Sequence, residues 1–346
     1  MQHPNTEQIV YVAAHSGGHI IPAITLAKNN QLAQKFLITS NQKLDVKIIE
    51  KNAPTFECLL LDLPHTPYNK SVFTYLSWFY KCFKSFILSL KYLFNLQNCK
   101  VVSTGSVLSI PVCLAAKILN KPIELYELNV KPGKSSRILA KLADKIYVIY
   151  QETTRYIKHQ NIEKTNYPIK WSNYQDPTLE EIKDFQQNFG HKKHIILIVG
   201  GSQGAKGLND LVIKWFNNCS LDDCTIIHQT GPQNNAQKFY DAKQINGFTY
   251  EFIENLDKFY KMADLVICRA GAGAIAEGLW SKAQIVLVPL EGAAENHQIE
   301  NAKAAADENP ERIMLIGENN QARLDDHFLK QLLELKAQRT ARNESR

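Results

Sequence analysis

Short apolar runs alternate with amphipathic segments along most of the chain. Short apolar runs bounded by polar residues are typical of buried strands, whereas apolar residues that recur every three or four positions are typical of helices. Helical patterns occur, for example, at 20–29, 109–119 and 135–143. They lie between most of the apolar runs of the first half, at 9–14, 36–40, 58–61, 100–104, 123–127 and 145–150.

The same alternation restarts after a stretch with Pro, Asn and Asp at 161–177. Alternating strands and helices predict parallel sheets with helices on both faces. We therefore expect two doubly wound α/β domains, at 1–165 and 166–325, with ligands at the carboxyl ends of the strands. A helix and polar tail at 326–346 is expected to pack back on the first domain. The second set of elements comprises strands at 194–200, 224–229, 248–253, 264–269 and 284–289 and helices at 204–217, 255–263, 274–281 and 294–307.

Composition narrows the class of protein. Of the 346 residues, 45% are hydrophobic and 21% charged, which excludes a disordered chain, a coiled coil and a collagen-like fibre. The seven cysteines include no CxxC pair and no zinc-like Cys/His spacing, so we expect reduced thiols in a cytosolic compartment and no metal site. We expect neither a signal peptide nor a run of ~18 apolar residues that would span a membrane. The net charge of +6 is too small to indicate nucleic acid by itself.

Three glycine-containing loops follow predicted strands. The first has the sequence AAHSGGHIIPA and spans 13–23. Gly17 and Gly18 would let the chain turn sharply into a helix, and Ser16 and His19 lie beside them. Peptide N–H groups at such a helix start can hold an anion. A tight strand-to-helix turn without a ligand is the alternative.

The other two loops lie in the second half. GGSQGAKGLND (200–210) places Ser202 and Gln203 at a strand-to-helix turn. It lacks both the GK[ST] of a P-loop and the G-x-G-x-x-G spacing, so nucleoside triphosphate hydrolysis and simple NAD binding are disfavoured. CRAGAGAIAEGLW (268–280) combines small residues with Glu277, whose carboxylate can accept hydrogen bonds from two ribose hydroxyls. An alanine-rich helix with a solvated glutamate is the alternative.

Taken together, these loops resemble a known family. Segments similar to the nucleotide-sugar domain of MurG-type peptidoglycan N-acetylglucosaminyltransferases are GGSQGAKGLN, FIENLDKFYKMADLVICRAGAGAIAE and VPLEGAAENHQIENA. Segments similar to the acceptor domain of that family are HSGGHIIPA and YELNVKPGKSSRILAKLADKIYV. The resemblance covers most of 8–310. It implies a GT-B architecture, in which two Rossmann-like domains face each other across a cleft.

The resemblance also implies a reaction. The family transfers N-acetylglucosamine, with inversion, from UDP-N-acetylglucosamine to the 4-hydroxyl of the muramyl sugar in lipid I, which gives lipid II for peptidoglycan synthesis. Such a transfer needs a base for the hydroxyl and donors for the departing UDP charge. The family needs no obligatory metal, and no DxD follows a predicted strand, so no cofactor is expected. A UDP-sugar transferase or epimerase with another acceptor and a catalytically weak nucleotide-sugar-binding scaffold are the alternatives.

Matched position by position, the family pattern implies a donor site. The Ile253 backbone would contact uracil, and Glu277 would take the ribose hydroxyls. Ser202 would bond a phosphate, while Gln298 and Asn301 would grip the sugar hydroxyls. The implied donor-binding residues are Ser16, Gly17, Gly18, Asn129, Lys170, Ser202, Gln203, Ile253, Ala272, Gly273, Ala274, Ile275, Ala276, Glu277, Gln298 and Asn301.

The same matching implies the catalytic groups. His19 is the candidate general base or a contact to the acceptor phosphate, since histidine as a residue type titrates near pH ~6.5. Glu127 and Tyr126 are the competing candidates for the base. Most departures from the family pattern fall in the acceptor half, so donor binding is the better supported part. In the acceptor half, this chain has Ala14-His15 where the family usually has two glycines, Tyr126 and Leu128 where it has His and Gln, and Lys170 where it has Arg. In the donor half, Gly273-Ala274 replaces a more common Leu-Thr.

A stretch rich in lysine and aromatic residues lies in the first half. Residues 63–123 contain seven lysines and no Asp or Glu. Aromatic residues and lysines interleave at helical spacing within 70–95, which favours docking on an anionic membrane surface. A core helix with a lysine edge and a nucleic-acid surface are the alternatives. The candidate contacts are Trp78, Phe79, Phe83 and Phe86 to lipid, and Lys81, Lys84 and Lys91 to headgroups.

Because the implied acceptor is anchored by a polyprenol, we expect a peripheral protein on the cytoplasmic face of the bacterial cell membrane. Its expected partners are UDP-N-acetylglucosamine, the polyprenyl-pyrophosphoryl-MurNAc-peptide, the anionic membrane surface and other cell-wall synthesis proteins. We do not expect a nucleic-acid partner.

Overall fold

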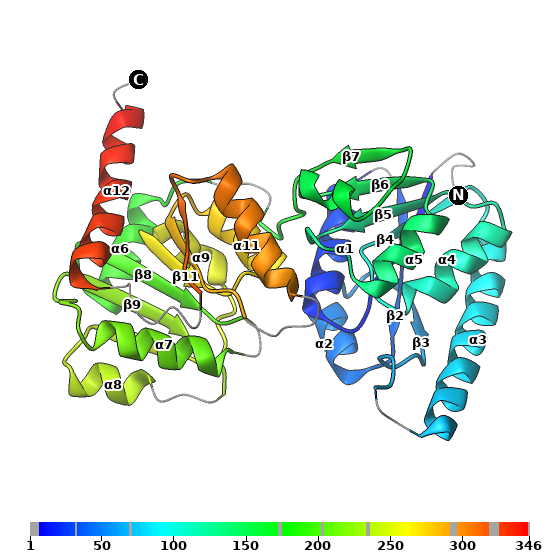
Figure 1. Ribbon diagram of the computed structural model, residues 1–346, viewed down its shortest axis with the longest axis horizontal. Coiled ribbons are helices and arrows are strands. Elements are labelled where there is room, and N and C mark those ends of the chain that lie inside the picture. The colour runs from blue at the N-terminus through cyan, green and yellow to red at the C-terminus, as the bar shows by residue number, and fades with distance from the viewer. Residues whose placement is uncertain are drawn as a thin grey trace. The chain divides into compact units, whose positions relative to one another are not determined.

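Two compact units make up the chain, Met1–Lys170 and Trp171–Arg346. In each unit a parallel sheet lies between layers of helices, so the expected α/β class with two doubly wound sheets is confirmed (Figure 1). The computed structural model describes residues 7–31, 33–68, 71–171, 175–201, 204–232, 236–290, 296–317 and 325–344, with side chains as far as Leu335.

The first unit is built on a seven-stranded parallel sheet in the order β3-β2-β1-β4-β5-β6-β7. The order reverses direction between β1 and β4, which is the switch point where doubly wound sheets open a crevice for ligands. The strands are β1 (Gln8–Val12), β2 (Gln34–Ser40), β3 (Glu57–Leu61), β4 (Cys99–Ser103), β5 (Ile123–Glu127), β6 (Lys145–Val148) and β7 (Ile162–Lys164).

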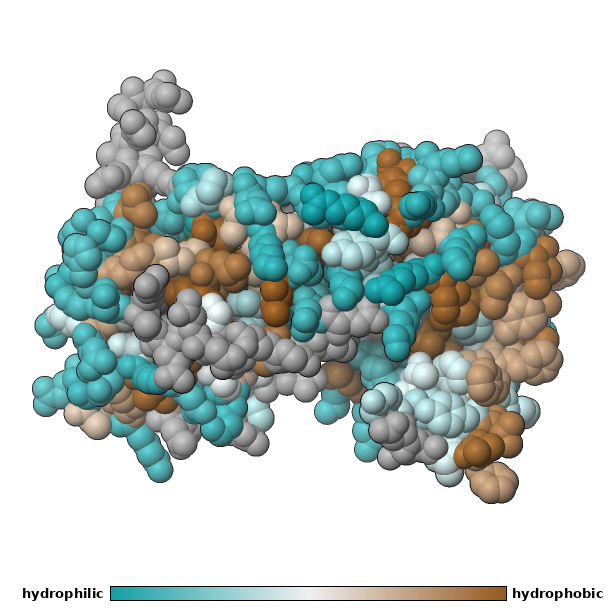
Figure 2. Space-filling view, in the orientation of Figure 1, coloured by the Kyte–Doolittle hydropathy of each residue, from teal (hydrophilic) through white to brown (hydrophobic). Residues whose placement is uncertain are grey.

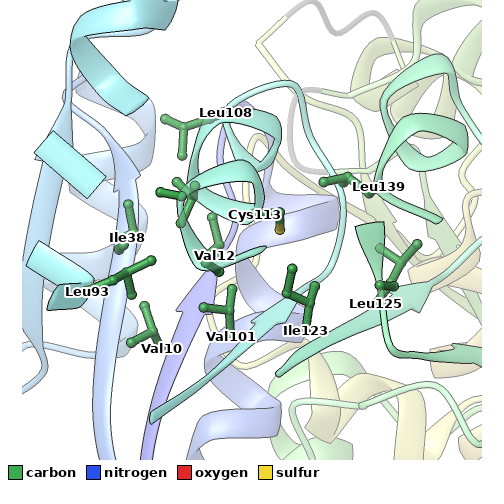
Figure 3. Close-up of a cluster of buried hydrophobic side chains, with 14 of the residues drawn as sticks. Val10, Val12, Ile38, Leu93, Val101, Leu108, Cys113, Ile123, Leu125 and Leu139 are labelled. Atoms are coloured by element: carbon green, nitrogen blue, oxygen red, sulfur yellow. The ribbon is translucent and has the colours of Figure 1, made fainter. Parts of the chain in front are cut away.

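Helices cover both faces of this sheet because strand residues alternate between the faces. Ile9 and Tyr11 of β1 face one cluster, with α1 and α2. Val10 and Val12 face the other, where Figure 3 shows them near Leu93, Cys113 and Val101. The helices are α1 (Gly17–Asn29), α2 (Lys43–Asn52), α3 (Val72–Asn95), α4 (Ser109–Ile118) and α5 (Lys134–Leu142), followed by the 3-10 helix Gln151–Arg155.

The second unit has a six-stranded parallel sheet in the order β10-β9-β8-β11-β12-β13. Its switch point lies between β8 and β11. The strands are β8 (His194–Val199), β9 (Cys224–Gln229), β10 (Gly247–Tyr250), β11 (Leu265–Cys268), β12 (Gln284–Leu287) and β13 (Ile313–Leu315), and the helices are α6 (Leu179–Phe189), α7 (Lys206–Phe216), α8 (Ala236–Ala242), α9 (Leu256–Met262), α10 (Ala272–Trp280), α11 (His297–Glu308) and α12 (Asp326–Glu344).

The C-terminal helix α12 begins on the second unit. Leu329, Leu332 and Leu333 are buried in the core that α7, β8 and β9 share. The side chains after Leu335 lie outside the described residues. Packing of the tail on the first domain therefore stays a prediction.

Helix starts differ in a way that bears on ligand binding. The Ser71 hydroxyl accepts the Thr74 N–H at 3.3 Å, and Thr178 forms a capping box with Glu181, so α3 and α6 satisfy N–H groups of their own first turns. No side chain caps α1 at Ser16 or α10 at Gly271, a feature they share with α2, α4, α5, α7, α9 and α11, and these two starts follow the switch-point strands β1 and β11. The N–H groups of Gly17 and Gly18 in α1 and of the first three residues of α10 lack an intrahelical acceptor and can receive an anion, whereas the His19 N–H already donates to the Ser16 carbonyl at 3.2 Å.

Candidate functional site

The loop after β1 turns at His15 and not at the glycines, which corrects the expectation for this loop. His15 has a φ of 71°, in the left-handed region, whereas Gly17 and Gly18 already belong to α1 with ordinary φ values. A non-glycine residue in this region needs compensating contacts. The Asp45 carboxylate accepts the His15 peptide N–H at 2.8 Å, and the imidazole Nε2 bonds the Leu63 carbonyl at 2.7 Å.

The environment of His15 keeps its ring neutral. Burial is the main cause that lowers the pKa of His15, and the neighbouring ring of His65, 4.4 Å away between centroids, adds to it. Asp45 also accepts a short hydrogen bond from the Ser40 hydroxyl. Sequence reasoning missed this support of the loop, because Asp45 lies in a largely polar segment without a recognisable motif.

His19, in the first turn of α1, has a defined tautomer. Its Nδ1 lies 2.6 Å from the carbonyl oxygen of Thr104, the residue after β4. A carbonyl oxygen can only accept, so in the neutral ring Nδ1 carries the proton and Nε2 presents a lone pair. The Thr104 hydroxyl in turn donates to the His19 carbonyl at 2.8 Å. The imidazole is therefore oriented by a neighbouring strand and has an acceptor nitrogen to offer.

The segment after β4 approaches the His19 ring closely. Gly105 has a φ of +99°, and a Cβ at this position would lie 3.1 Å from His19 Cε1 and 3.4 Å from Ser136 Oγ. Glycine is needed here both for the backbone conformation and for the space. Because β1 and β4 pair at the switch point, the two loops lie side by side. Sequence reasoning missed this Thr-Gly segment, although a glycine after a predicted strand was the available signal.

Glu127 and Asn129 follow β5 at the same edge of the sheet. Glu127 is buried, and its Oε1 accepts the Asn129 backbone N–H at 2.9 Å and the Asn129 amide at 3.4 Å. Within the described part of the chain, Oε2 has no hydrogen-bond partner. Glu127 thus orients Asn129 in this structure. The structure argues against Tyr126 as a base, because burial raises its pKa and its ring stacks on Tyr147. Lys170 lies exposed at the end of the first unit, and its implied donor contact stays a prediction.

In the second unit, α10 starts directly after β11 at the switch point. Gly271 is extended, and Ala272, Gly273 and Ala274 form the first turn, partly exposed. The Ile275 N–H donates to the Gly271 carbonyl at 3.0 Å, which begins the helical ladder. The side chains of Ile275 and Ala276 are buried. Those two side chains therefore pack inside the second unit, and contacts of Ile275 and Ala276 with the donor stay a prediction.

Glu277 is half-buried, so it is not a solvated glutamate on a surface helix. Burial, together with the Glu277 charge, raises the pKa of Cys268 to about 12 and holds the pKa of Tyr260 well above its usual range. The Tyr260 ring lies 5.6 Å from that of Trp171, which in turn lies 5.3 Å from Trp280. An aromatic layer thus backs the helix that carries Glu277.

The loops after β8, β9 and β10 meet through a residue that sequence reasoning missed. The Ile253 N–H donates to the Gln229 side-chain oxygen at 2.9 Å, and the Gln229 amide donates to the Gly201 carbonyl at 2.9 Å. The Ile253 N–H is therefore occupied by a hydrogen bond within the protein. The Ile253 carbonyl keeps lone pairs that can accept a hydrogen bond from a nucleobase. The predicted contacts Ser202 and Gln203 lie outside the described residues.

Helix α11 carries the remaining predicted donor contacts. The Gln298 side-chain oxygen accepts the Leu290 N–H at 3.0 Å, which directs the amide N–H groups elsewhere. Asn301 is completely buried, with a relative exposure of 0%. Asn301 is therefore not accessible to sugar hydroxyls in this conformation, and its contact with the sugar stays a prediction. His297 is half-buried at the helix start.

Helix α3 presents an apolar face without a partner among the described residues. Phe79 and Phe83 are 61% and 62% exposed, and Lys84 is exposed among them. Figure 2 shows hydrophobic residues gathered over this helix. No helix in the described ranges is long and apolar enough to cross a bilayer. The other strongly exposed apolar side chains of α3 and α4 are Val72, Phe73, Leu76, Tyr80, Phe94 and Ile118.

Three predicted membrane contacts on α3 are corrected. The Trp78 indole N–H donates to the Pro64 carbonyl at 3.1 Å, and its ring packs against the core of the first unit. Phe86 packs against the same core. Lys81 pairs with Asp62 at 3.0 Å. The sequence pattern placed these residues on the helix correctly but could not tell which side faces the sheet.

No group of three or more His, Cys, Asp or Glu side chains that could hold a metal ion occurs in the ranges that the structure covers. The polar groups at both switch points are instead hydrogen-bond donors and acceptors. This arrangement suits an anionic or hydroxyl-rich ligand.

Comparison with known proteins agrees with this geometry. Residues 9–148 match the glycosyltransferase family 28 N-terminal domain, and residues 195–346 match the family 28 C-terminal domain. The crystal structure of MurG from Acinetobacter baumannii superposes with a TM-score of 0.72 at 23% identity, over 96% of this chain and 94% of that one. This structural likeness confirms the GT-B-like fold.

Two curated relatives carry one enzyme name, UDP-N-acetylglucosamine–N-acetylmuramyl-(pentapeptide) pyrophosphoryl-undecaprenol N-acetylglucosamine transferase. The protein from Halothermothrix orenii is 32% identical over 314 residues, which is 86% of this chain and 82% of the relative. The protein from Trichodesmium erythraeum is 30% identical over 332 residues, which is 94% of this chain and 84% of the relative. The chain therefore belongs to glycosyltransferase family 28, within the group of the MurG N-acetylglucosaminyltransferases.

Proposed function

We propose that this protein transfers N-acetylglucosamine from UDP-N-acetylglucosamine to the 4-hydroxyl of the muramyl sugar in lipid I, with inversion, and so forms lipid II. The observation that carries the proposal is the start of α10 at the second switch point. Its uncapped first turn is followed by the half-buried Glu277. Relatives that are 32% and 30% identical are named for the same transfer.

The donor half is assigned to the second unit. N–H groups in the first turn of α10 hold the pyrophosphate, since a helix N-terminus favours negative charge. The Glu277 carboxylate accepts from the ribose hydroxyls, and the Ile253 carbonyl accepts from the N3–H of uracil. The Gln298 amide N–H groups face the sugar. As the bond to the sugar breaks, the same α10 N–H groups stabilise the charge that develops on UDP, without a cofactor.

The acceptor half is assigned to the first unit. His19 Nε2 takes the proton of the attacking 4-hydroxyl, because Nδ1–H is committed to the Thr104 carbonyl and fixes the tautomer. The uncapped first turn of α1 lies beside it and suits the acceptor phosphates. Glu127 holds Asn129, which is placed near the transferred sugar. One in-line displacement then inverts the anomeric carbon.

The exposed face of α3 supports a peripheral location at an anionic membrane surface. Phe79 and Phe83 supply apolar side chains, and Lys84 and Lys91 supply positive charge. Each lysine near an anionic surface contributes about 1 kcal/mol. A lipid-anchored acceptor makes such docking useful, because enzyme and substrate then meet at one surface. The cytoplasmic face is proposed because UDP-sugars are cytoplasmic metabolites.

A transfer assay tests the proposal. The protein is incubated with UDP-N-acetylglucosamine and a short-chain lipid I analogue, and the disaccharide lipid is measured by mass spectrometry. We expect a product that carries one additional N-acetylglucosamine and an equal amount of released UDP. UDP release with a different acceptor and none with lipid I would favour another transferase. UDP binding without any turnover would favour a scaffold.

A further inference from the structure

Gln229, the last residue of β9, joins two loops that follow other strands. It is 2% exposed. Its amide nitrogen donates to the Gly201 carbonyl after β8, and its amide oxygen accepts the Ile253 N–H after β10, both at 2.9 Å. Because β9 lies between β8 and β10 in the sheet, one central side chain ties the loops of both neighbours.

The partners of Gln229 fix the orientation of its amide group. A peptide N–H can only donate and a peptide carbonyl can only accept, so the side-chain oxygen must face Ile253 and the nitrogen must face Gly201. The Gly204 N–H donates to the same Gly201 carbonyl at 3.1 Å. Gln229 is therefore the second donor on the Gly201 carbonyl. A partly buried carbonyl that loses such a donor carries a free-energy cost.

A buried polar layer holds the backbone on either side of Gln229. His228 bonds the Tyr240 hydroxyl at 2.9 Å and the Asn209 side-chain oxygen at 3.1 Å. The Asn209 amide donates to the Thr230 carbonyl at 2.9 Å. A Cβ on Gly204 would clash with the same Thr230 carbonyl, so Gly204 rests directly on this backbone. Gln229 thus projects from a rigid base.

We propose that Gln229 is a positioning residue of the donor site. Through the Gly201 carbonyl and the Ile253 N–H it holds the backbone after β8 and the backbone after β10 at a fixed separation, so that the Ile253 carbonyl keeps its place for the uracil ring of UDP. This inference rests on the proposed function. Gln229 itself does not touch the reacting atoms.

The test uses Gln229→Met and Gln229→Glu, with Gln237→Glu as the matched control. Gln237 on α8 also bridges backbone groups, through bonds to the Gly247 carbonyl and the Thr249 N–H, but both belong to β10. UDP affinity is measured by calorimetry at about pH 8 and about pH 5.5 relative to wild type at each pH. Circular dichroism must show that each variant keeps the wild-type fold.

Gln229→Met removes both hydrogen bonds and should weaken UDP binding about 10- to 100-fold. Gln229→Glu should bind weakly at about pH 8, where a carboxylate faces the Gly201 carbonyl. At about pH 5.5 it should recover several-fold, because a protonated carboxyl can donate to Gly201 again. His228 does not titrate in this range, since burial lowers its pKa to about 3. Gln237→Glu should stay within about twofold of wild type.

Three results would overturn the inference: wild-type affinity in both Gln229 variants, an equal loss in Gln237→Glu, or no recovery of Gln229→Glu at the lower pH. Hydrogen exchange without ligand separates this inference from the proposed function. The Gly204 and Ile253 N–H groups should exchange faster in Gln229→Met than in wild type. If wild type binds no UDP, the proposed function fails, and unchanged exchange at these two groups would refute the positioning role on its own.

Discussion

His19, Glu127 and Glu277 differ in their hydrogen bonds and in their burial. The Nδ1–H of the neutral His19 ring donates to the Thr104 carbonyl, and Nε2 remains as an acceptor. Glu127 is buried, and its Oε1 accepts the Asn129 N–H, so it is poorly placed to accept a proton from a substrate. Glu277 is half-buried on a helix whose first turn is uncapped. These arrangements support the roles proposed above, proton transfer for His19 and ribose binding for Glu277.

Replacing His19 by alanine should lower kcat by ~10²–10⁴-fold, because the acceptor hydroxyl loses its base. UDP affinity should stay within about twofold, since His19 belongs to the acceptor half. Initial rates in the transfer assay and UDP calorimetry provide the two measurements. A variant that keeps kcat and loses only acceptor affinity would make His19 a binding residue. Glu127→Gln, tested in parallel, should retain more activity than His19→Ala.

Replacing Glu277 by alanine should weaken UDP binding by about 1–3 kcal/mol, the usual effect of losing charge-assisted hydrogen bonds. The loss should be smaller for 2′-deoxy-UDP, which lacks one of the ribose hydroxyls, and calorimetry with both nucleotides measures the difference. Glu300→Ala on α11 is a matched control, because it removes a carboxylate from the same unit outside the assigned contacts. Equal affinity of wild type and Glu277→Ala for UDP would refute the ribose assignment.

The sequence predicted the site residues unevenly. His19 and Ala272 lie in first turns of helices that follow strands, and Glu277 lies further along the same helix as Ala272, because glycine-containing strand-to-helix turns have a local signature. The burial of Asn301 and Ile275 could not be predicted, since helical spacing alone does not say which side of a short helix faces the sheet. Residues such as Thr104 and Gln229 were missed, because their partners lie far away in the chain.

At the scale of secondary structure, α3 differs from the other helices of the first unit. It buries one narrow side, through Ser85, Ser89 and Leu93, and leaves large apolar side chains exposed. A helix that only covered a sheet would place polar residues on its outer face. The exposed face therefore favours contact with a second apolar phase, such as the interfacial region of a bilayer.

The double substitution Phe79→Ser with Phe83→Ser should release the protein from anionic vesicles in a flotation assay. The thermal transition should stay within a few degrees of wild type, since both rings are exposed. Added salt should weaken the wild-type binding by screening the lysines. Trp78→Ser is the control for the opposite face and should lower the thermal transition, because Trp78 packs on the core. Equal flotation of the double variant would contradict membrane docking by this face.

The buried hydrogen-bonded cluster of His228, Tyr240 and Asn209 predicts a pH effect on stability. Burial lowers the pKa of His228 from 6.5 to about 3, so between these values the unfolded chain binds a proton that the folded chain does not. The free energy of unfolding should therefore fall as the pH drops below 6.5 toward 3, by up to about 1.4 kcal/mol per pH unit from this residue. His228→Gln should show a shallower slope in denaturant unfolding between about pH 7 and pH 5. An unchanged slope would show that other groups control the acid range.

The predicted elements agree with the observed ones where apolar patterns are strong. The strand predicted at 224–229 coincides with β9, and the helix predicted at 109–119 exceeds α4 by one residue. Sequence reasoning passed over α2, α6 and α8, which are short or mainly polar. It also passed over β7 and β13, each only three residues long. Such elements are held by tertiary packing more than by their own pattern.

At the scale of the whole molecule, both units have the same architecture, a doubly wound parallel sheet. Each unit has a parallel sheet whose strand order reverses once, and each places an uncapped helix start at that reversal. One reversal offers an oriented imidazole, and the other offers a half-buried carboxylate on its helix. A reaction between an acceptor hydroxyl and a nucleotide-linked sugar uses both kinds of site.

The stereochemistry of the product tests this account most directly. The anomeric carbon of UDP-N-acetylglucosamine is α-linked, and a single in-line displacement by the lipid I hydroxyl inverts it. Proton NMR of the purified disaccharide lipid should therefore show one new β-linked N-acetylglucosamine on the 4-oxygen of the muramyl sugar. An α-linked product, a linkage to another oxygen, or no disaccharide lipid at all would contradict inverting transfer to lipid I.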